Sequence, residues 1–256
     1  MKTVLITGAS SGIGKELAWV FAEKNYRPIL VARRKSMLEI VAQDIKESFF
    51  IDAIVISLDL AKSDSAEKLM EIIDNQNLNI DVLVNNAGFG DYGDFYQTNT
   101  VKMESMMNLN MLTLTKLSRI ISAKMVEQGF GQILNIASTA AFQAVPSFAV
   151  YAATKAYVLH FSEAIAHELK PLGIHVTTIC PGPTHSEFQE KAGMQNSDKL
   201  FDTAPLAFLV AEFAFEAMMK RKTLAIYGSK NQFLTFMLRF SPRKLNTMIA
   251  AKMMKD

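Results

Sequence analysis

The chain has 256 residues, of which 50% are hydrophobic and 20% are charged; these shares are close to the averages of soluble globular proteins and exclude a disordered or collagen-like chain. Lys and Arg number 27 against 25 Asp and Glu, and no nucleic-acid-binding motif accompanies this net charge of +2, so no nucleic-acid partner is expected. The single cysteine, Cys180, and four scattered histidines exclude an intramolecular disulfide and give no metal-ligand spacing, so no metal is expected.

Short apolar segments alternate with longer segments of helical periodicity along the chain. The short segments are 4–7 residues long and apolar on both faces, which is typical of strands buried between two layers of helices. Their alternation with helices predicts right-handed crossovers and a mostly parallel sheet. The strands are expected at 3–7, 28–32, 53–58, 80–84, 132–137, 174–180 and 224–227, and the helices at 14–24, 36–47, 64–75, 100–128, 148–170 and 204–220.

The first predicted strand runs directly into the glycine-rich turn G-A-S-S-G-I-G, residues 8–14. Glycines permit a tight turn and a close approach to a pyrophosphate, whose charge is stabilised by the free N–H groups at the start of the following helix. The spacing differs from the common G-x-G-x-x-G fingerprint. A glycine turn without a ligand is the alternative, but its position at the first strand–helix junction favours a nucleotide site. The expected ligand-binding residues are Gly8, Ser10, Ser11, Gly12, Ile13 and Gly14.

The end of the second predicted strand is where the ribose of a bound dinucleotide is expected. An acid there would bind the 2′-hydroxyl of NAD, but the sequence reads Ala32-Arg33-Arg34-Lys35. A guanidinium matches a phosphate dianion, so NADP(H) is the expected cofactor, with Arg33 as the first candidate ligand and Arg34 as the second. The alternative is a solvated basic run, although positive charge at the start of a helix opposes the helix dipole.

Further polar features follow in chain order. The motif N-N-A-G, residues 85–88, follows the fourth strand, Asn110 lies within the long helix, and Ser138 comes just after the fifth strand. Tyr151 and Lys155 are spaced to lie one turn apart on the same face of the next helix. Each alone has an ordinary alternative, as a surface helix residue, a turn residue or an aromatic at a helix start. Together and in this order they indicate a catalytic site.

In these residues the chain resembles the short-chain dehydrogenase/reductase family, in its branch of single-domain enzymes of about this length, which includes keto-acyl and hydroxysteroid reductases. The resemblance implies a doubly wound Rossmann-type α/β fold with a mostly parallel seven-stranded sheet in the order 3-2-1-4-5-6-7. It also implies hydride transfer between NADP(H) and a carbonyl or alcohol. It extends from Lys2 to Phe188 and rests on T-G-x-x-x-G-I-G, Asp59-Leu60, N-N-A-G, Asn110, Ser138, Y-x-x-x-K and Pro181-Gly182.

The same resemblance assigns roles to four side chains. Tyr151 is the expected general acid/base, and Lys155 is expected to hold the nicotinamide ribose and to lower the pKa of the phenol from its ordinary value near 10. Ser138 would bind the substrate oxygen, and Asn110 would fix a water that connects Lys155 to solvent. The residues expected to contact the cofactor, besides those of the glycine turn and the two arginines, are Asp59, Leu60, Asn86, Ala87, Gly88, Tyr151, Lys155, Pro181, Gly182 and Thr184.

A substrate pocket is expected in the loops that follow the strands, since ligands of parallel sheets bind outside the carboxyl ends. These loops are mostly apolar or aromatic and contain no Arg or Lys at the reacting end, so the expected substrate is an apolar carbonyl compound such as a long-chain or cyclic ketone. His185 is interpreted as orienting a neighbour rather than as an acid. The expected pocket residues are Phe89, Tyr92, Ser138, Phe148, Tyr151, His185 and Phe188, with Phe95 and Met194 in the same loops; several of these aromatics have a core residue as the alternative.

The last segment differs in charge from the rest. From Lys220 onward there are nine Lys or Arg and one acid, which leaves residues 1–219 with 18 − 24 = −6. No composition break, linker or internal repeat occurs within residues 1–228, which are predicted to form one NADP-binding catalytic domain. Residues 229–256 are predicted to form a basic amphipathic helical extension. Such an extension lies on an anionic membrane, packs on a second subunit of a dimer or tetramer, or covers the pocket; the sequence leaves these alternatives open.

Two other functions remain as alternatives to a reductase. One is a catalytically silent NADP-binding regulator, and the other is a membrane-peripheral interaction protein that acts through the basic extension. The first apolar run is interrupted by Gly8 and no run of ~18 uncharged apolar residues exists, so neither a targeting segment nor a transmembrane helix is predicted. We expect a cytoplasmic protein. The alternative is a cytoplasmic protein that also contacts a membrane surface.

Overall fold

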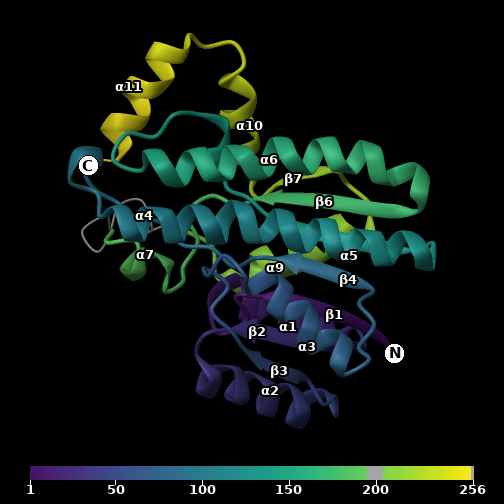
Figure 1. The fold of residues 1–256 in the computed structure, drawn as a ribbon. Coiled ribbons are helices and arrows are strands. Elements are labelled where there is room, and N and C mark those ends of the chain that lie inside the picture. Colours follow the sequence, from purple (N-terminus) through teal and green to yellow (C-terminus); the bar gives the residue numbers. More distant parts are fainter. Residues whose placement is uncertain (195–203, 255–256) are drawn as a thin grey trace.

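The computed structural model describes residues 1–194 and 204–254, which form a sheet flanked by helices (Figure 1). The sheet has seven strands in the order β3-β2-β1-β4-β5-β6-β7, and each neighbouring pair is parallel. This confirms the predicted doubly wound fold and its strand order. The strands are β1 (Lys2–Thr7), β2 (Tyr26–Ala32), β3 (Ile54–Ser57), β4 (Val82–Asn85), β5 (Gly131–Ile136), β6 (Ile174–Cys180) and β7 (Leu224–Ile226).

Helices pack on both faces of the sheet, and each interface is apolar. Phe21 and Leu38 are fully buried on one face, and Leu69 and Ile121 are buried on the other. Burial of each such side chain contributes roughly 1.5–3 kcal/mol to stability. The first layer contains α1 (Gly12–Glu23), α2 (Lys35–Phe49) and α9 (Ala207–Met219), and the second contains α3 (Ser65–Asn75), α5 (Leu114–Gln128) and α6 (Ala149–Leu169).

The single long helix expected at 100–128 is interrupted in the structure. Here α4 (Thr100–Met107) passes into a π-helical turn at Asn108–Thr113 before α5 begins. The turn contains Asn110, whose side-chain amide bonds to groups outside its own helix. Periodicity does not reveal this interruption, because the apolar face continues through it. π-Turns of this kind occur often at functional sites.

The basic extension forms two helices rather than one. α10 (Ser229–Met237) and α11 (Arg243–Met253) lie beyond α6 and β7 in Figure 1, and we call them together the C-terminal hairpin. The end of α11 returns to the loop after β4, where the Tyr92 hydroxyl donates a hydrogen bond of 2.7 Å to the Met254 carbonyl. Lys255, the last basic residue of the sequence, lies outside the described residues. Among the described helices, none combines the length and the apolar character needed to cross a bilayer.

Candidate active site

A cavity of about 750 Å³ extends along the carboxyl ends of the strands. Residues that directly follow β1 to β6 line it, so the topology of the sheet places the expected motifs around one space. The cavity continues past these loops to the inner side of the C-terminal hairpin. The glycine turn and the hairpin are thus the two ends of one elongated site.

The glycine turn between β1 and α1 needs its glycines. Gly8 and Gly12 have positive φ angles of 70° and 54°, which other residues rarely adopt. Gly14 does not line the cavity; a Cβ there would lie 2.3 Å from the Gly8 carbonyl oxygen, so this glycine permits close packing of helix on turn. The Asn86 amide donates to the Thr7 carbonyl at 2.9 Å and fixes the turn from the neighbouring strand.

The cavity next to this turn fits a dinucleotide. α1 begins at Gly12, and the side chain of Ser11 does not cap it, so the first N–H groups of the helix remain available for an anion. Arg33 lies exposed at the cavity wall, and Asp59 and Leu60 line the same end. All the other residues expected to bind the cofactor, apart from Gly14, also line the cavity.

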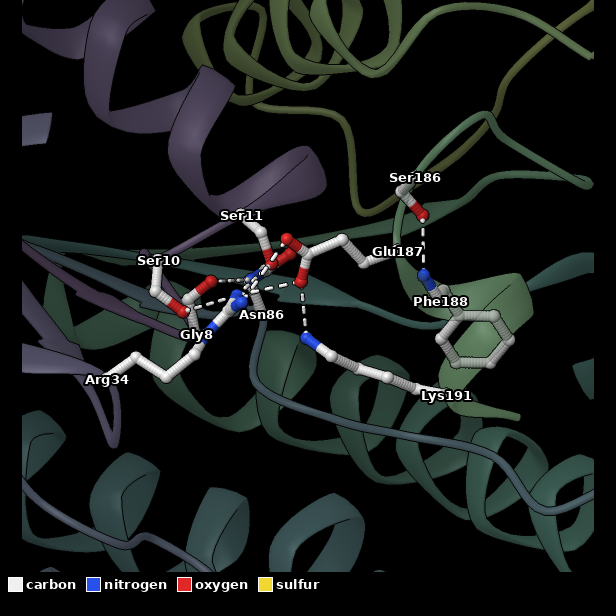
Figure 2. Close-up of polar contacts among 9 residues, drawn as sticks. All are labelled: Gly8, Ser10, Ser11, Arg34, Asn86, Ser186, Glu187, Phe188 and Lys191. Carbon is white, nitrogen blue, oxygen red and sulfur yellow. Dashed lines mark hydrogen bonds and ion pairs between the residues drawn. The ribbon is translucent and has the colours of Figure 1, made fainter. Parts of the chain in front are cut away.

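Arg34 lies in a cluster of polar groups that the sequence does not predict (Figure 2). Its guanidinium donates to both carboxylate oxygens of Glu187, at 3.2 and 2.8 Å, and to the Ser10 and Ser11 hydroxyls at 3.2 and 2.9 Å. The Lys191 ammonium also contacts this carboxylate, at 2.5 Å. Glu187 lies 153 positions from Arg34, so no local pattern reveals the pair.

Tyr151 and Lys155 lie on the first turns of α6, both buried, and both line the cavity together with Ser138. The Lys155 ammonium lies 5.8 Å from the centre of the Tyr151 ring and donates a hydrogen bond of 2.8 Å to the Ile136 carbonyl at the end of β5. Helical spacing therefore puts the phenol and the ammonium on one face of α6, and the sheet topology brings Ser138, which follows β5, beside the phenol.

Burial has the largest effect on the pKa of both Tyr151 and Lys155. It raises the pKa of Tyr151 to about 12, against a hydrogen bond with Ser138 that acts in the opposite direction. Burial also lowers the pKa of Lys155 to about 8. In the protein alone, removal of water from around the phenol therefore sets the direction of the shift, which is upward from the ordinary value near 10. The lowering of this pKa by Lys155 stays a prediction for the complex with the cofactor.

Asn110 lies behind the cavity wall rather than on it. Its side-chain nitrogen donates to the Phe89 carbonyl at 3.0 Å and to the Thr154 hydroxyl at 3.1 Å, while its oxygen accepts from the Phe89 N–H at 3.2 Å. Thr154 in turn donates to the Tyr151 carbonyl at 2.7 Å. Asn110 thus connects the π-turn to the loop after β4 and to the start of α6, which is a positioning role.

Aromatic rings enclose the tyrosine. Phe148 stacks on Tyr151 with ring centres 4.4 Å apart, and Phe188 lies 5.3 Å away. Gly90 leaves room for this stack, since a Cβ there would lie 2.4 Å from the Phe148 ring. With Phe89, Val145 and Met194, these rings give the space above the phenol an apolar wall.

Three residues expected near the pocket lie elsewhere. His185 is exposed and does not line the cavity, and its backbone N–H donates a hydrogen bond to the Pro205 carbonyl. Phe95 is 66% exposed and also lies outside the lining. Tyr92 packs beside Phe148 and bonds to the end of α11, so it supports the wall without forming it.

The C-terminal hairpin lines the far part of the cavity, which is one of the three alternatives that the sequence leaves open for the basic extension. Among the described lining residues, the charged ones all come from the cofactor end, from the tyrosine helix or from α7 (Phe188–Lys191). Helical spacing of the apolar residues was the available signal, but it does not say against what the helices pack. The lining residues from the hairpin include Leu234, Met237, Leu238, Ile249, Ala250 and Met253.

Comparisons with known proteins identify the family of the chain. The chain is 34% identical to the very-long-chain 3-oxoacyl-CoA reductase of Rattus norvegicus over 69% of its length and 57% of that protein's, and 34% identical to the ketoacyl reductase HetN of a Nostoc strain over 71% and 63%. It thus spans about three-fifths of these relatives. A short-chain dehydrogenase from Sphingobium yanoikuyae, solved in complex with NADPH, has a TM-score of 0.84 and 30% identity, over 94% of both chains. The family model "short chain dehydrogenase" matches residues 2–197, and the chain belongs to this family.

Proposed function

We propose that the protein catalyses NADPH-dependent reduction of a carbonyl group in an apolar substrate to an alcohol. The observation that carries this proposal is one cavity in which Tyr151, Lys155 and Ser138 lie between a dinucleotide-binding turn and an apolar wall. The reaction is reversible in principle. The intact set of polar residues argues against a silent regulator, because a protein that only bound the cofactor would have no need for a buried phenol facing the second half of the cavity.

In the reducing direction the bound cofactor supplies the hydride. Tyr151 donates the proton to the carbonyl oxygen, and its raised pKa keeps the phenol protonated at neutral pH. The Ser138 hydroxyl binds the same oxygen as negative charge develops on it. Phe148 and Phe188 exclude water from this position. Lys155, with a pKa of about 8, exchanges protons readily near neutrality and returns one toward the tyrosine.

Support for NADP(H) rather than NAD comes from the end of β2. Arg33 lines the cavity there, and no acid occupies the position that would bind a free 2′-hydroxyl. In the described part of the chain, the Arg33 guanidinium has no hydrogen bond or ion pair with a protein group. It is therefore directly available to a phosphate, whereas Arg34 binds the Glu187 carboxylate and becomes available only when that carboxylate is displaced.

The substrate class follows from the apolar half of the cavity. This half runs from Phe148 past Phe188 to the hairpin, and no charged side chain of the described residues lines the hairpin part. A long-chain or cyclic ketone fits this surface better than a small keto acid does. The two relatives are named as reductases of 3-oxoacyl and ketoacyl groups, which supports a carbonyl that carries an acyl chain.

The test is a substrate panel with NADPH, followed by loss of NADPH absorbance. The panel contains 3-oxoacyl thioesters with short and long chains, a bulky cyclic ketone and a small keto acid. We expect turnover of the apolar compounds and a higher kcat/KM for the long chain than for the short one. Preferred turnover of the keto acid contradicts the substrate class, and no turnover of any carbonyl compound contradicts the reductase.

A second proposal concerns the outer side of the hairpin. Five cations and no acid occur within residues 229–254, and large apolar side chains such as Phe233 and Phe240 are 63% and 70% exposed between them. This combination favours contact with an anionic membrane surface; a subunit interface is the alternative, and the dimer or tetramer expected from the family resemblance stays a proposal.

Co-sedimentation with lipid vesicles distinguishes membrane contact from a subunit interface. The protein should bind vesicles that contain phosphatidylserine, and the double variant Arg243→Glu/Lys244→Glu should bind about 30-fold less, because two cations are lost at roughly 1 kcal/mol each. The control is Lys62→Glu, an exposed cation of the loop before α3. Equal binding of both variants, or a concentration-dependent dimer without vesicle binding, contradicts the membrane contact.

A further inference from the structure

We propose that Glu187 is an internal anion that occupies the phosphate-binding groups of the cofactor site, so that NADPH has to displace it, and that this displacement is passed on to Phe188 in the substrate pocket. The inference rests on the proposed NADPH-dependent function. It assigns a role in cofactor selection to a residue that is neither in the glycine turn nor next to the tyrosine.

The groups around Glu187 are those that bind phosphates in proteins. The carboxylate accepts from the two terminal nitrogens of Arg34 and from Lys191, and the Ser10 and Ser11 hydroxyls bond to the same guanidinium (Figure 2). A guanidinium fork, an ammonium and hydroxyls beside a helix N-terminus form an anion site. In this structure, a carboxylate of the protein itself fills it.

The surroundings of Glu187 favour the charged form of its carboxyl group. Burial of the carboxyl opposes ionisation, but hydrogen bonds from Arg34, Lys191 and Ser11 outweigh it and lower the pKa to about 2. The group therefore stays anionic throughout the range in which the protein would work. Two anions cannot use the same donors of Arg34, and Arg34 follows β2, where the ribose phosphate of NADPH is expected. Glu187 therefore competes with that phosphate.

The ion pair is also suited to being displaced. The side chains of Arg34 and Glu187 are 39% and 38% exposed, and ion pairs with this exposure contribute little to stability because solvent screens them. A phosphate dianion carries more charge than the carboxylate it replaces. The competition consequently lowers cofactor affinity modestly and does not prevent binding.

The segment 186–188 connects this cluster to the tyrosine. A Cβ at Gly12 would lie 3.1 Å from the Cβ of Ser186, so the segment rests on the glycine turn. The Ser186 hydroxyl accepts from the Phe188 N–H at 3.3 Å, and the Phe188 ring lies beside Tyr151. Because Glu187 and Phe188 are neighbours, release of the carboxylate frees the backbone that holds the ring over the phenol. Cofactor binding thereby adjusts the substrate pocket.

The first experiment measures dissociation constants for NADPH and NADH by fluorescence titration of the purified full-length chain. Glu187→Gln should bind NADPH up to about fivefold more tightly, the factor that corresponds to 1 kcal/mol, and NADH within twofold of wild type. The matched control is Glu190→Gln, which removes the same charge from an exposed neighbour that contacts none of these groups. Unchanged or weaker NADPH binding, equal tightening for both cofactors, or an equal effect of Glu190→Gln overturns the competition.

A second measurement uses the Arg34→Ala background. If the two anions compete for this guanidinium, Glu187→Gln changes NADPH affinity by less than twofold once Arg34 is absent. If Glu187→Gln still tightens NADPH binding fivefold without Arg34, the lost negative charge acts through the overall electrostatic field of the site. That result overturns the competition for Arg34. Where wild-type protein binds neither cofactor, the proposed function itself fails; where it binds NADPH but both variants behave like wild type, only the role of Glu187 fails.

Hydrogen exchange tests the link to the pocket without any turnover. In the protein alone, backbone amides of residues 186–191 should exchange faster in Glu187→Gln than in wild type and in Glu190→Gln, because the carboxylate no longer ties this segment to Arg34. Equal exchange in the three proteins overturns the coupling to Phe188.

Discussion

The two ends of the cavity are built by different means. At the glycine turn, backbone conformation and a dense set of hydrogen bonds fix each group, and a single added Cβ at Gly14 would collide with the backbone. At the C-terminal hairpin, apolar side chains with several methionines form the wall, and no charged group of the described residues lines it. Rigid polar geometry selects one ligand, whereas flexible apolar side chains accept ligands of varied shape. The tyrosine lies where the two meet.

The largest expected effect comes from removing the proton donor between the two ends. Tyr151→Phe should lower kcat by about 10³-fold, within the range that general acid catalysis contributes, while the dissociation constant for NADPH stays within twofold. Stopped-flow turnover and fluorescence titration give the two values. Retained turnover would mean that another group donates the proton, and a parallel loss of NADPH binding would mean that Tyr151 belongs to the cofactor end.

The cofactor end of the cavity should distinguish NADPH from NADH by the extra phosphate of NADPH, a kind of selection that the apolar hairpin cannot make. Arg33→Ala should weaken NADPH binding about 10- to 100-fold, since charge-assisted hydrogen bonds contribute about 1.5–3 kcal/mol, and should leave NADH binding nearly unchanged. Titration with both cofactors checks this. Equal losses for the two would remove Arg33 from the phosphate site.

Burial of Lys155 has a measurable consequence for stability. Its pKa in the folded protein is lowered to about 8, below the ordinary value of about 10.4 expected on unfolding. The unfolded chain therefore binds more protons between these values, and stability rises with pH in that window. Relative to Lys155→Met, wild type should gain about 2 kcal/mol in unfolding free energy from pH 7 to 9.5, measured by urea unfolding. A constant difference between the two proteins would contradict the lowered pKa.

The smallest effect is expected at the hairpin, and it should depend on the substrate. Leu234 and Leu245 are 45% and 46% exposed, but only Leu234 lines the cavity. Leu234→Ala should lower kcat/KM about fivefold for a long-chain ketone, as loss of roughly 1 kcal/mol of apolar contact predicts, and leave a short ketone within twofold. Leu245→Ala serves as the control. Equal effects of the two variants would place the substrate chain outside the hairpin.

The contrast between the two ends also explains what could be predicted from sequence. The alternation of strands and helices, the glycine turn and the shared helix face of Tyr151 and Lys155 follow from local periodicity and motif spacing, because each motif directly follows its strand or starts its helix. The order of the strands in the sheet follows from the family resemblance. The π-turn at Asn110 depends on hydrogen bonds to distant groups, and the Arg34–Glu187 pair on a contact across 153 positions. The direction of the tyrosine pKa depends on burial that motif spacing does not reveal.

The Tyr92–Met254 hydrogen bond has a mechanical consequence for the site. It fastens the last helix to the loop after β4, so the far wall of the cavity is held at both of its ends rather than hinged at one. A wall held in this way forms a closed ring of chain. A flap fastened at only one end would, by contrast, be free to swing aside from the cavity.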